Sequence, residues 1–316
     1  NMLQNHPAQI HINIIGLDSP LLGILDPAYK NVHEDMQKPF FFYVEEATTF
    51  EGSPEHAADI IPPSHLSFDN LNNKFLKNKN FLGFISHIKD TCKYLYQKYN
   101  VNCYHLPISS SDKDEKRIND RINSLRSNRP VTLIAWSSWH DIKDGNFFKR
   151  GGPTIDLIVS HLFRQGVNIN LIMRTAKELQ CRQFNPIRVV TIDRYLDKAQ
   201  MDELFYKGDI FLIPSLQVHS ASLTYAFSYG MPCVTTNGWG IPEFCVDGFN
   251  SLRGDIKSDR YVAEMVKRIK ELCENRSSLI RKSQNTLAWS KSNHSRTNHK
   301  NNFVNLINGA MRNHSL

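Results

Sequence analysis

The feature that most constrains the fold is a regular alternation of strand-like and helix-like segments between residues 131 and 272. Short apolar runs typical of buried strands alternate with segments whose apolar residues recur at helical spacing. The strand-like runs are 131–136, 169–173, 187–192, 209–213 and 233–236, and the helix-like segments are 153–166, 197–208, 222–230 and 258–272. Repeated β–α units of this length require a parallel sheet with helices on both faces. The sequence therefore predicts a Rossmann-like α/β domain.

The first half of the chain carries fewer such units. Its strand-like runs are 10–15, 39–44, 81–86 and 103–108, with a helix-like segment at 88–99. This pattern predicts a second, smaller α/β domain. A charged helix-like stretch at 109–130 leads into the expected junction. We expect three parts: a short N-terminal α/β domain over residues 1–128, a Rossmann-like domain over 129–282, and a helical tail over 283–316 that packs back towards the first domain.

The formal charge of +7 is concentrated in the second half. Residues 1–128 hold 13 Lys and Arg against 15 Asp and Glu, whereas residues 129–316 hold 25 against 16. A basic half attracts anions such as nucleotides, anionic membranes or nucleic acid, although scattered solvated lysines explain the same numbers. Nucleic acid is the weakest of these interpretations, because no interleaving of basic and aromatic residues and no recognised binding motif is present.

The six cysteines are scattered, with no C-x-x-C pair. This spacing favours reduced thiols in a cytoplasmic protein and argues against a zinc site or a disulfide framework. No run of about 18 apolar residues predicts a membrane span, and the first residues lack the pattern of a secretory signal. We expect a cytoplasmic location, with peripheral contact at the anionic inner face of a membrane left open.

The segment after the strand at 209–213 begins a helix near Ser220. Ligands of parallel sheets lie outside the carboxyl ends of the strands, and a helix start carries about half a positive charge and unpaired N–H groups. The small residues Ser220, Ala221 and Ser222 allow a phosphate to approach that backbone closely. Taken alone, these residues are better explained by a serine that caps the helix.

A longer set of motifs surrounds this helix start. In chain order they are Asp209, Pro214-Ser215, Ala226 through Gly230-Met231-Pro232, Gly240-Ile241-Pro242-Glu243, and Asp247-Gly248-Phe249-Asn250. In this order and near this spacing, the run resembles the C-terminal signature of family-four glycosyltransferases. These are retaining enzymes of the GT-B architecture, in which two Rossmann-like domains face a cleft. The resemblance spans roughly residues 80–290 and covers the first 80 only weakly, which implies a shortened N-terminal domain.

The resemblance gives roles to several charged residues. Lys149 and Arg150, in the run before Gly151-Gly152, fill the cationic positions that grip a diphosphate leaving group. Arg174 would touch the phosphates or the base, and Glu243 would lie near the donor. Without the family context, Lys149 and Arg150 are better explained as a solvated pair, and a surface role explains Arg174 equally well.

The sequence also departs from the family pattern. Tyr225 stands where the second glutamate of the Glu-x7-Glu motif binds ribose hydroxyls, and the first glutamate falls on Gln217 or Val218. His219 is the nearest residue that could hydrogen-bond a donor sugar. Neither a phenol nor an amide offers the charge-assisted hydrogen bond of a carboxylate. Either donor recognition has been rebuilt or catalysis has been lost.

On the acceptor side, the family places a histidine after the strand equivalent to 39–44. Here Glu45 and Glu46 occupy that place, and a surface role is the better interpretation of both. An Asp-x-Asp run at 112–114 resembles a metal motif of another glycosyltransferase architecture, but it lies in a charged helix with no strand before it. We therefore expect no bound metal.

The expected function is a retaining, hexosyltransferase-type glycosyltransferase. It would move a sugar from a nucleoside-diphosphate sugar to a saccharide or lipid-linked acceptor, as in polysaccharide biosynthesis, without a cofactor or a bound metal. The main alternative is a catalytically degenerate protein of the same fold that binds a nucleotide sugar or a partner. A sugar-nucleotide epimerase of related architecture has no positive signal in the sequence.

Overall fold

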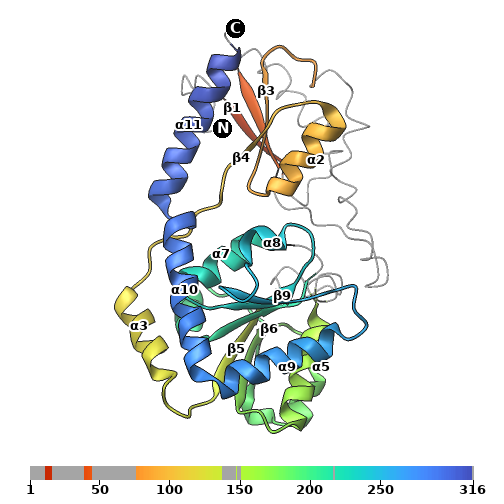
Figure 1. Cartoon of the computed structure of the whole chain (residues 1–316), viewed down its shortest axis with the longest axis vertical. Coiled ribbons are helices and arrows are strands. Elements are labelled where there is room, and N and C mark those ends of the chain that lie inside the picture. Colours follow the sequence, from red (N-terminus) through yellow and green to blue (C-terminus); the bar gives the residue numbers. More distant parts are fainter. Residues whose placement is uncertain are drawn as a thin grey trace. The chain divides into compact units, whose positions relative to one another are not determined.

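The computed structural model describes residues 11–15, 39–44, 76–136, 147, 151–215 and 218–314. These residues fall into two compact units, and each has its own apolar core (Figure 1). The first unit holds the described residues up to Ile108 and those from His299 onwards, and the second holds those from Ser109 to Asn298. Each unit is described below by itself.

A parallel sheet forms the centre of the first unit. Its strands, in spatial order, are β1 (His11–Ile15), β2 (Phe40–Val44), β3 (Phe81–Ser86) and β4 (Cys103–His105). Helix α2 (Lys89–Tyr99) connects β3 to β4, and most of the C-terminal helix α11 (Arg296–His314) belongs to the same unit. The predicted strand at 103–108 is shorter than expected, since pairing with β3 ends at His105.

The two faces of this sheet are covered by different helices, because successive strand side chains point to opposite faces. On one face, Phe40 packs in a cluster with Leu95 of α2. On the other face, Phe41 and Ile85 pack in a cluster with Ala310 of α11. The last helix of the chain therefore completes the core of the first unit.

The second unit contains a larger parallel sheet in the order β10-β9-β8-β5-β6-β7. Its strands are β5 (Val131–Trp136), β6 (Ile169–Arg174), β7 (Val189–Ile192), β8 (Ile210–Ile213), β9 (Cys233–Thr236) and β10 (Ser251–Gly254). Every residue of β8 and β9 is buried, which accounts for the continuous apolar sequence of β8, and in β9 the buried hydroxyls of Thr235 and Thr236 donate to the carbonyl oxygens of Ile213 and Ser215. The predicted strand at 187–192 begins later because Pro186–Arg188 forms a short 3-10 turn.

Helices follow the strands in the order that the alternating pattern predicts, with one additional short helix between β9 and β10 that it did not predict. They are α5 (Gly152–Arg164), α6 (Lys198–Lys207), α7 (Ser220–Ser228), α8 (Ile241–Phe244) and α9 (Tyr261–Glu274). Helix α5 packs against α9, and these two lie on the opposite side of the sheet from α7 and α8 (Figure 1). Helix α10 (Arg276–His294) packs against α7. None of the described helices is long and apolar enough to cross a membrane.

The charged stretch at 109–130 differs from the expectation. It forms a shorter helix, α3 (Glu115–Ser124), which starts after Asp114 because that carboxylate accepts a hydrogen bond from the N–H of Arg117 at 3.1 Å. Ile118 and Ile122 belong to the core of the second unit. The unit boundary therefore falls after Ile108 and not near residue 128, and the predicted tail is divided, with α10 in the second unit and most of α11 in the first.

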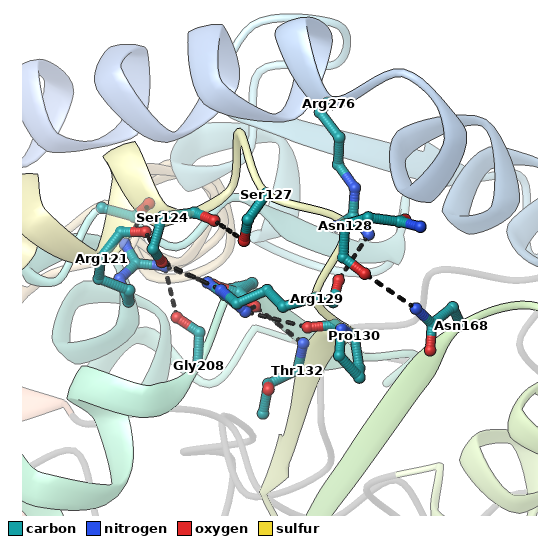
Figure 2. A network of polar contacts seen from close by, with 12 residues as sticks. Arg121, Ser124, Ser127, Asn128, Arg129, Pro130, Thr132, Asn168, Gly208 and Arg276 are labelled. Atoms are coloured by element: carbon teal, nitrogen blue, oxygen red, sulfur yellow. Dashed lines mark hydrogen bonds and ion pairs between the residues drawn. The ribbon is translucent and has the colours of Figure 1, made fainter.

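A buried polar network fastens α3 to the amino end of β8 (Figure 2). The guanidinium of Arg121 donates to the carbonyl oxygens of Gly208 and Tyr229, and that of Arg129 pairs with the fully buried carboxylate of Asp209. Burial lowers the pKa of Arg121, and the carboxylate of Asp209 opposes that shift. The acidic residue at the start of this family motif thus has a structural role in this chain.

Candidate functional site

The strand order of the second unit reverses between β8 and β5. From β5 the chain proceeds to β6 and β7 on one side, and from β8 it proceeds to β9 and β10 on the other. In open parallel sheets, ligands bind beyond the carboxyl ends of the strands at such a reversal. The segments that follow β5 and β8 therefore define the candidate site.

Helix α5 begins directly beside the end of β8. Its N-cap, Gly151, has a φ of +76°, and a Cβ atom there would lie 2.3 Å from the carbonyl oxygen of Pro214. At Gly152, a Cβ atom would lie 2.5 Å from the ring of Phe147. The two glycines of the Lys-Arg-Gly-Gly run are therefore required by close packing, and they place the start of a 13-residue helix against the segment after β8.

Helix α7 begins at Ser220, six residues after Pro214. His219 is its N-cap residue, is only 5% exposed, and makes no side-chain cap hydrogen bond. In the first turn Ser220 is buried, Ser222 is half-buried and Ala221 is exposed. The N–H groups of a first turn have no partners within the helix and carry partial positive charge. The positions predicted to bind a phosphate are thus at the carboxyl edge of the sheet, beside the start of α5.

Hydrogen bonds hold the segments after β8 and β9 together. The hydroxyl of Thr236 donates to the carbonyl oxygen of Ser215, and the N–H of Val218 donates to the carbonyl oxygen of Trp239 at 2.8 Å. Glu243 lies beyond this loop in the four-residue helix α8, which follows Gly240 in its left-handed conformation. Glu243 is half-buried, so its carboxylate is partly accessible at the same edge.

Arg174 is the last residue of β6, in register with Trp136 of β5 and Ile192 of β7. It is 8% exposed. Burial lowers its pKa, and the nearby phenol of Tyr195 opposes that shift. Since β6 and β8 are separated by β5, the backbone of Arg174 lies two strand spacings from β8, about 10 Å.

Tyr225 takes part in a cluster centred on Asp202 of α6. The hydroxyls of Tyr225 and Tyr229 both donate to one oxygen of Asp202, and the ammonium of Lys113 donates to the same oxygen at 2.9 Å. Lys198 donates to the other oxygen at 2.7 Å. Lys113 also lies over both phenol rings, 4.2 and 4.6 Å from their centroids. The Tyr225 hydroxyl is therefore engaged with a carboxylate of its own unit.

This cluster alters the titration of its members. Burial alone would raise the pKa of Asp202, but the hydrogen bonds from Lys198, the two tyrosines and Lys113 together hold it well below its usual range. Burial, followed by the hydrogen bond to Asp202, raises the pKa of Tyr225. The cluster is thus a carboxylate surrounded by donors, and it holds α6, α7 and the segment before α3 together.

Five of the predicted residues lie outside the described part of the chain. They are Glu45, Glu46, Lys149, Arg150 and Gln217. Of the other predicted residues, the structure brings His219, Ser220, Ala221 and Ser222 together at α7. It places Arg174 and Glu243 at the same sheet edge, and Tyr225 within the Asp202 cluster.

Sequence reasoning overlooked a pair of polar residues at the carboxyl edge of the first unit. The hydroxyl of Tyr43, in β2, lies 2.9 Å from Nδ1 of His87, which directly follows β3 and is buried. Both residues come at the ends of predicted strands, which is the signal that could have found them. They form a polar pair at the carboxyl edge of that sheet.

Among the described residues, no group of three or more His, Cys, Asp or Glu side chains is arranged to hold a metal ion. No protein-family model and no curated protein sequence matches the chain. The likeness to solved structures is extensive. Three of them are the pneumococcal O-GlcNAc transferase GtfA in complex with UDP and GlcNAc, Anabaena HepE in complex with UDP and glucose, and a glycosyltransferase from Rickettsia africae.

These matches differ in the share of each chain that they cover. The chain matches GtfA with a TM-score of 0.62 at 12% identity over 91% of this chain and 55% of that one. HepE matches with a TM-score of 0.60 at 13% identity, over 86% of this chain and 72% of that one. The Rickettsia protein matches with a TM-score of 0.57 at 8% identity, over 98% of this chain and 100% of that one. The chain spans about half the length of several matched structures, GtfA and TarM among them. These likenesses establish the fold: the chain has the α/β GT-B fold with parallel sheets.

Proposed function

We propose that the protein is a glycosyltransferase that takes a sugar from a nucleoside-diphosphate sugar and transfers it, with retention of configuration, to a saccharide or lipid-linked acceptor. The observation that carries the proposal is the meeting of two helix starts at the sheet reversal. Gly151 packs against Pro214 at the start of α5, and α7 starts at Ser220 just beyond. Two helix N-termini at one edge make a ready site for a diphosphate.

The residues of this edge supply the chemistry that the reaction needs. Negative charge builds on the departing nucleoside diphosphate, and preorganised donors and cations stabilise it. The first-turn N–H groups of α7 provide donors, and Lys149 and Arg150 immediately precede Gly151 in the chain. We propose that these two cations grip the diphosphate and that the reaction needs no bound metal and no cofactor.

The remaining assignments belong to the same proposal. His219 and Gln217 would contact the donor sugar, Arg174 the phosphate or the base, and Glu243 the donor. Three structures of two proteins of this fold support the donor class: GtfA contains UDP with GlcNAc, and HepE contains UDP with glucose in one structure and UDP-glucose in another. We expect the protein to act in the cytoplasm, in peripheral contact with the inner membrane face when the acceptor is lipid-linked, as in polysaccharide biosynthesis.

A second candidate function is favoured by a specific contact. The tyrosine that replaces the family's second glutamate donates its hydroxyl to Asp202. A phenol held in this way already donates its proton to the carboxylate and cannot also donate it to a ribose oxygen. The alternative is therefore a protein of this fold that binds a nucleotide sugar without transferring the sugar.

The test is incubation with UDP-, GDP-, dTDP- and ADP-sugars in the presence of saccharide acceptors. Binding is measured by thermal shift, and turnover by release of free nucleotide. Turnover supports the transferase, binding without release supports the binding protein, and no stabilisation by any nucleotide contradicts both. We expect Arg150→Ala to weaken nucleotide binding by at least ~1 kcal/mol, as loss of a charged hydrogen bond does. The control is Arg126→Ala, an exposed residue between α3 and β5, which should leave the affinity unchanged.

A further inference from the structure

The loop between β9 and α8 contains a tryptophan at the candidate site. The carbonyl oxygen of Trp239 accepts a hydrogen bond from the N–H of Val218, the residue before the N-cap of α7. The N–H of Gly238 donates to the hydroxyl of Thr236 at 3.2 Å, and that hydroxyl reaches the carbonyl oxygen of Ser215. The backbone of Trp239 is therefore tied to the start of α7, where the diphosphate is proposed to bind.

The side chain of Trp239 has an unusual feature. The residue is half-buried, and its indole Nε1–H is buried with no hydrogen-bond partner among the residues that the structure describes. A buried donor without an acceptor is destabilising, and most buried polar groups in folded proteins are paired. An indole N–H only donates, so its partner must supply an oxygen or a similar acceptor.

The indole N–H of Trp289 in α10 is also buried without a partner among the residues that the structure describes. The position of each tryptophan relative to the candidate site therefore distinguishes the two. Trp289 packs against the ring of Phe249, with ring centroids 6.2 Å apart. Among the described residues, no hydrogen bond joins Trp289 to the end of a strand. Trp239 is joined through its own backbone to the segment before α7. The two residues therefore make a matched pair, one at the candidate site and one away from it.

The chemistry of indole indicates which part of a donor it contacts. The ring carries no charge, so it adds little to the binding of a diphosphate, for which helix starts and cations are the suitable partners. A flat nucleobase needs an open slot beside a ring, whereas Trp239 is half-buried. A sugar fits both properties of the side chain, since its C–H face packs on an aromatic surface and its hydroxyl oxygens accept from the N–H.

We propose that Trp239 binds the sugar of the donor, with its indole N–H donating to a sugar hydroxyl oxygen. This inference rests on the proposed function, because it requires a nucleotide sugar at the same sheet edge. Trp239 is then a specificity-determining residue: it contributes to affinity for the nucleotide sugar and not to affinity for the nucleotide alone.

The test compares Trp239→Phe with Trp289→Phe, since phenylalanine keeps an aromatic ring and both variants lose the same indole N–H and the same five-membered ring. Dissociation constants are measured calorimetrically for UDP and GDP and for UDP-glucose, UDP-GlcNAc and GDP-mannose. Trp239→Phe should weaken the nucleotide sugar roughly fivefold, as loss of one neutral hydrogen bond does, and should change the nucleotide by less than about twofold. Trp289→Phe should change neither beyond that margin.

Two further readouts separate the outcomes. Addition of the nucleotide sugar should change the tryptophan emission of the wild type and of Trp289→Phe more than that of Trp239→Phe, in which Trp136 at the end of β5 still contributes. Equal weakening of nucleotide and nucleotide sugar in Trp239→Phe, or no difference from Trp289→Phe, overturns the assignment while leaving the proposed function intact. A wild-type protein that binds neither ligand class overturns the proposed function, and the assignment falls with it. Thermal unfolding of each variant identifies a misfolded protein. If Trp239→Phe misfolds, an emission change in Trp289→Phe supports the assignment, and no change contradicts it.

Discussion

Arg129 and Asp209 form a bidentate ion pair inside the second unit. Nη1 of Arg129 lies 2.7 Å from Oδ2 of Asp209 and Nη2 lies 2.8 Å from Oδ1. The carboxylate is fully buried and also accepts the N–H of Thr132 at 2.8 Å, and Arg121 lies 3.4 Å away. One aspartate therefore holds together the entry to β5, the entry to β8 and helix α3.

Asp209→Asn should destabilise the second unit strongly. The substitution leaves two guanidinium groups next to a neutral amide in a buried setting, and removing one partner of a buried ion pair costs about 3–5 kcal/mol. The measurement is the free energy of unfolding in urea at neutral pH.

The chain offers a control with the same geometry at its surface. Arg117 and Glu203 also form a bidentate ion pair, with Nη1 2.7 Å from Oε1 and Nη2 2.9 Å from Oε2, but both side chains are well exposed. Solvent screens such pairs, so Glu203→Gln should change the unfolding free energy little. A loss in Asp209→Asn no larger than that in Glu203→Gln would contradict the role given to Asp209.

Gly151→Ala should damage both stability and nucleotide binding. The left-handed backbone of Gly151 already disfavours a Cβ atom, and alanine would also place that atom 2.3 Å from the carbonyl oxygen of Pro214. Gly166→Ala is the control, because its φ is +69° but a Cβ atom there meets nothing within 4 Å. The control should lose only the conformational cost, about 1–2 kcal/mol.

These two variants are compared by urea unfolding and by the thermal shift that nucleotides produce. We expect Gly151→Ala to unfold more easily than Gly166→Ala and to lose the nucleotide-induced shift, because α5 can no longer start against β8. Similar losses of stability with intact binding in both variants would show that the approach of Gly151 to Pro214 is not important for the site.

Asp202→Asn should remove a pH-dependent part of the stability. The folded-state pKa of Asp202 is held below the value of about 3.9 that an unfolded aspartate has. A carboxyl group with a lowered folded pKa stabilises the fold above its unfolded pKa, and this contribution is lost as the pH falls towards the folded value. The variant should therefore be less stable than the wild type at pH 7, and the difference should shrink between about pH 5 and pH 3.

Urea unfolding of both proteins at pH 7, 5, 4 and 3 measures this difference directly. A difference that is constant over the whole range would mean that Asp202 acts through packing and not through its charge. Because the cluster contains Tyr225, the same variant also tests the engagement of that phenol. If Tyr225 is freed to bind a ribose hydroxyl, nucleotide affinity should rise in Asp202→Asn.

Much of the second unit could be predicted from local patterns. The runs 131–136 and 233–236 coincide with β5 and β9, because buried strands are rich in apolar and β-branched residues. Strand β10 was missed, since Ser251–Gly254 is short and half polar. The location of the α7 start at a strand end was also predictable, because it follows from the order of strand and helix along the chain.

The contacts of individual side chains were not predictable in this way. Tyr225 was expected to face a nucleotide by analogy, yet its hydroxyl meets Asp202, 23 residues earlier in the chain. Charged residues in the stretch 109–130 gave no sign that Arg121 would be buried against Gly208. Sequence patterns report which face of a segment is apolar, and they do not report which other segment covers that face.

Periodicity along the chain was sufficient to predict two α/β units, and the resemblance carried by the motif order added a GT-B architecture and a candidate ligand site at one edge of the larger sheet. Those features depend on interactions between near neighbours, which the residue order contains. The division of the chain at Ile108, the return of α11 to the first unit and the partners of Asp202 and Asp209 depend on contacts between distant segments. Packing of the whole chain selects such contacts, because burial and charge pairing are satisfied together only in the folded state.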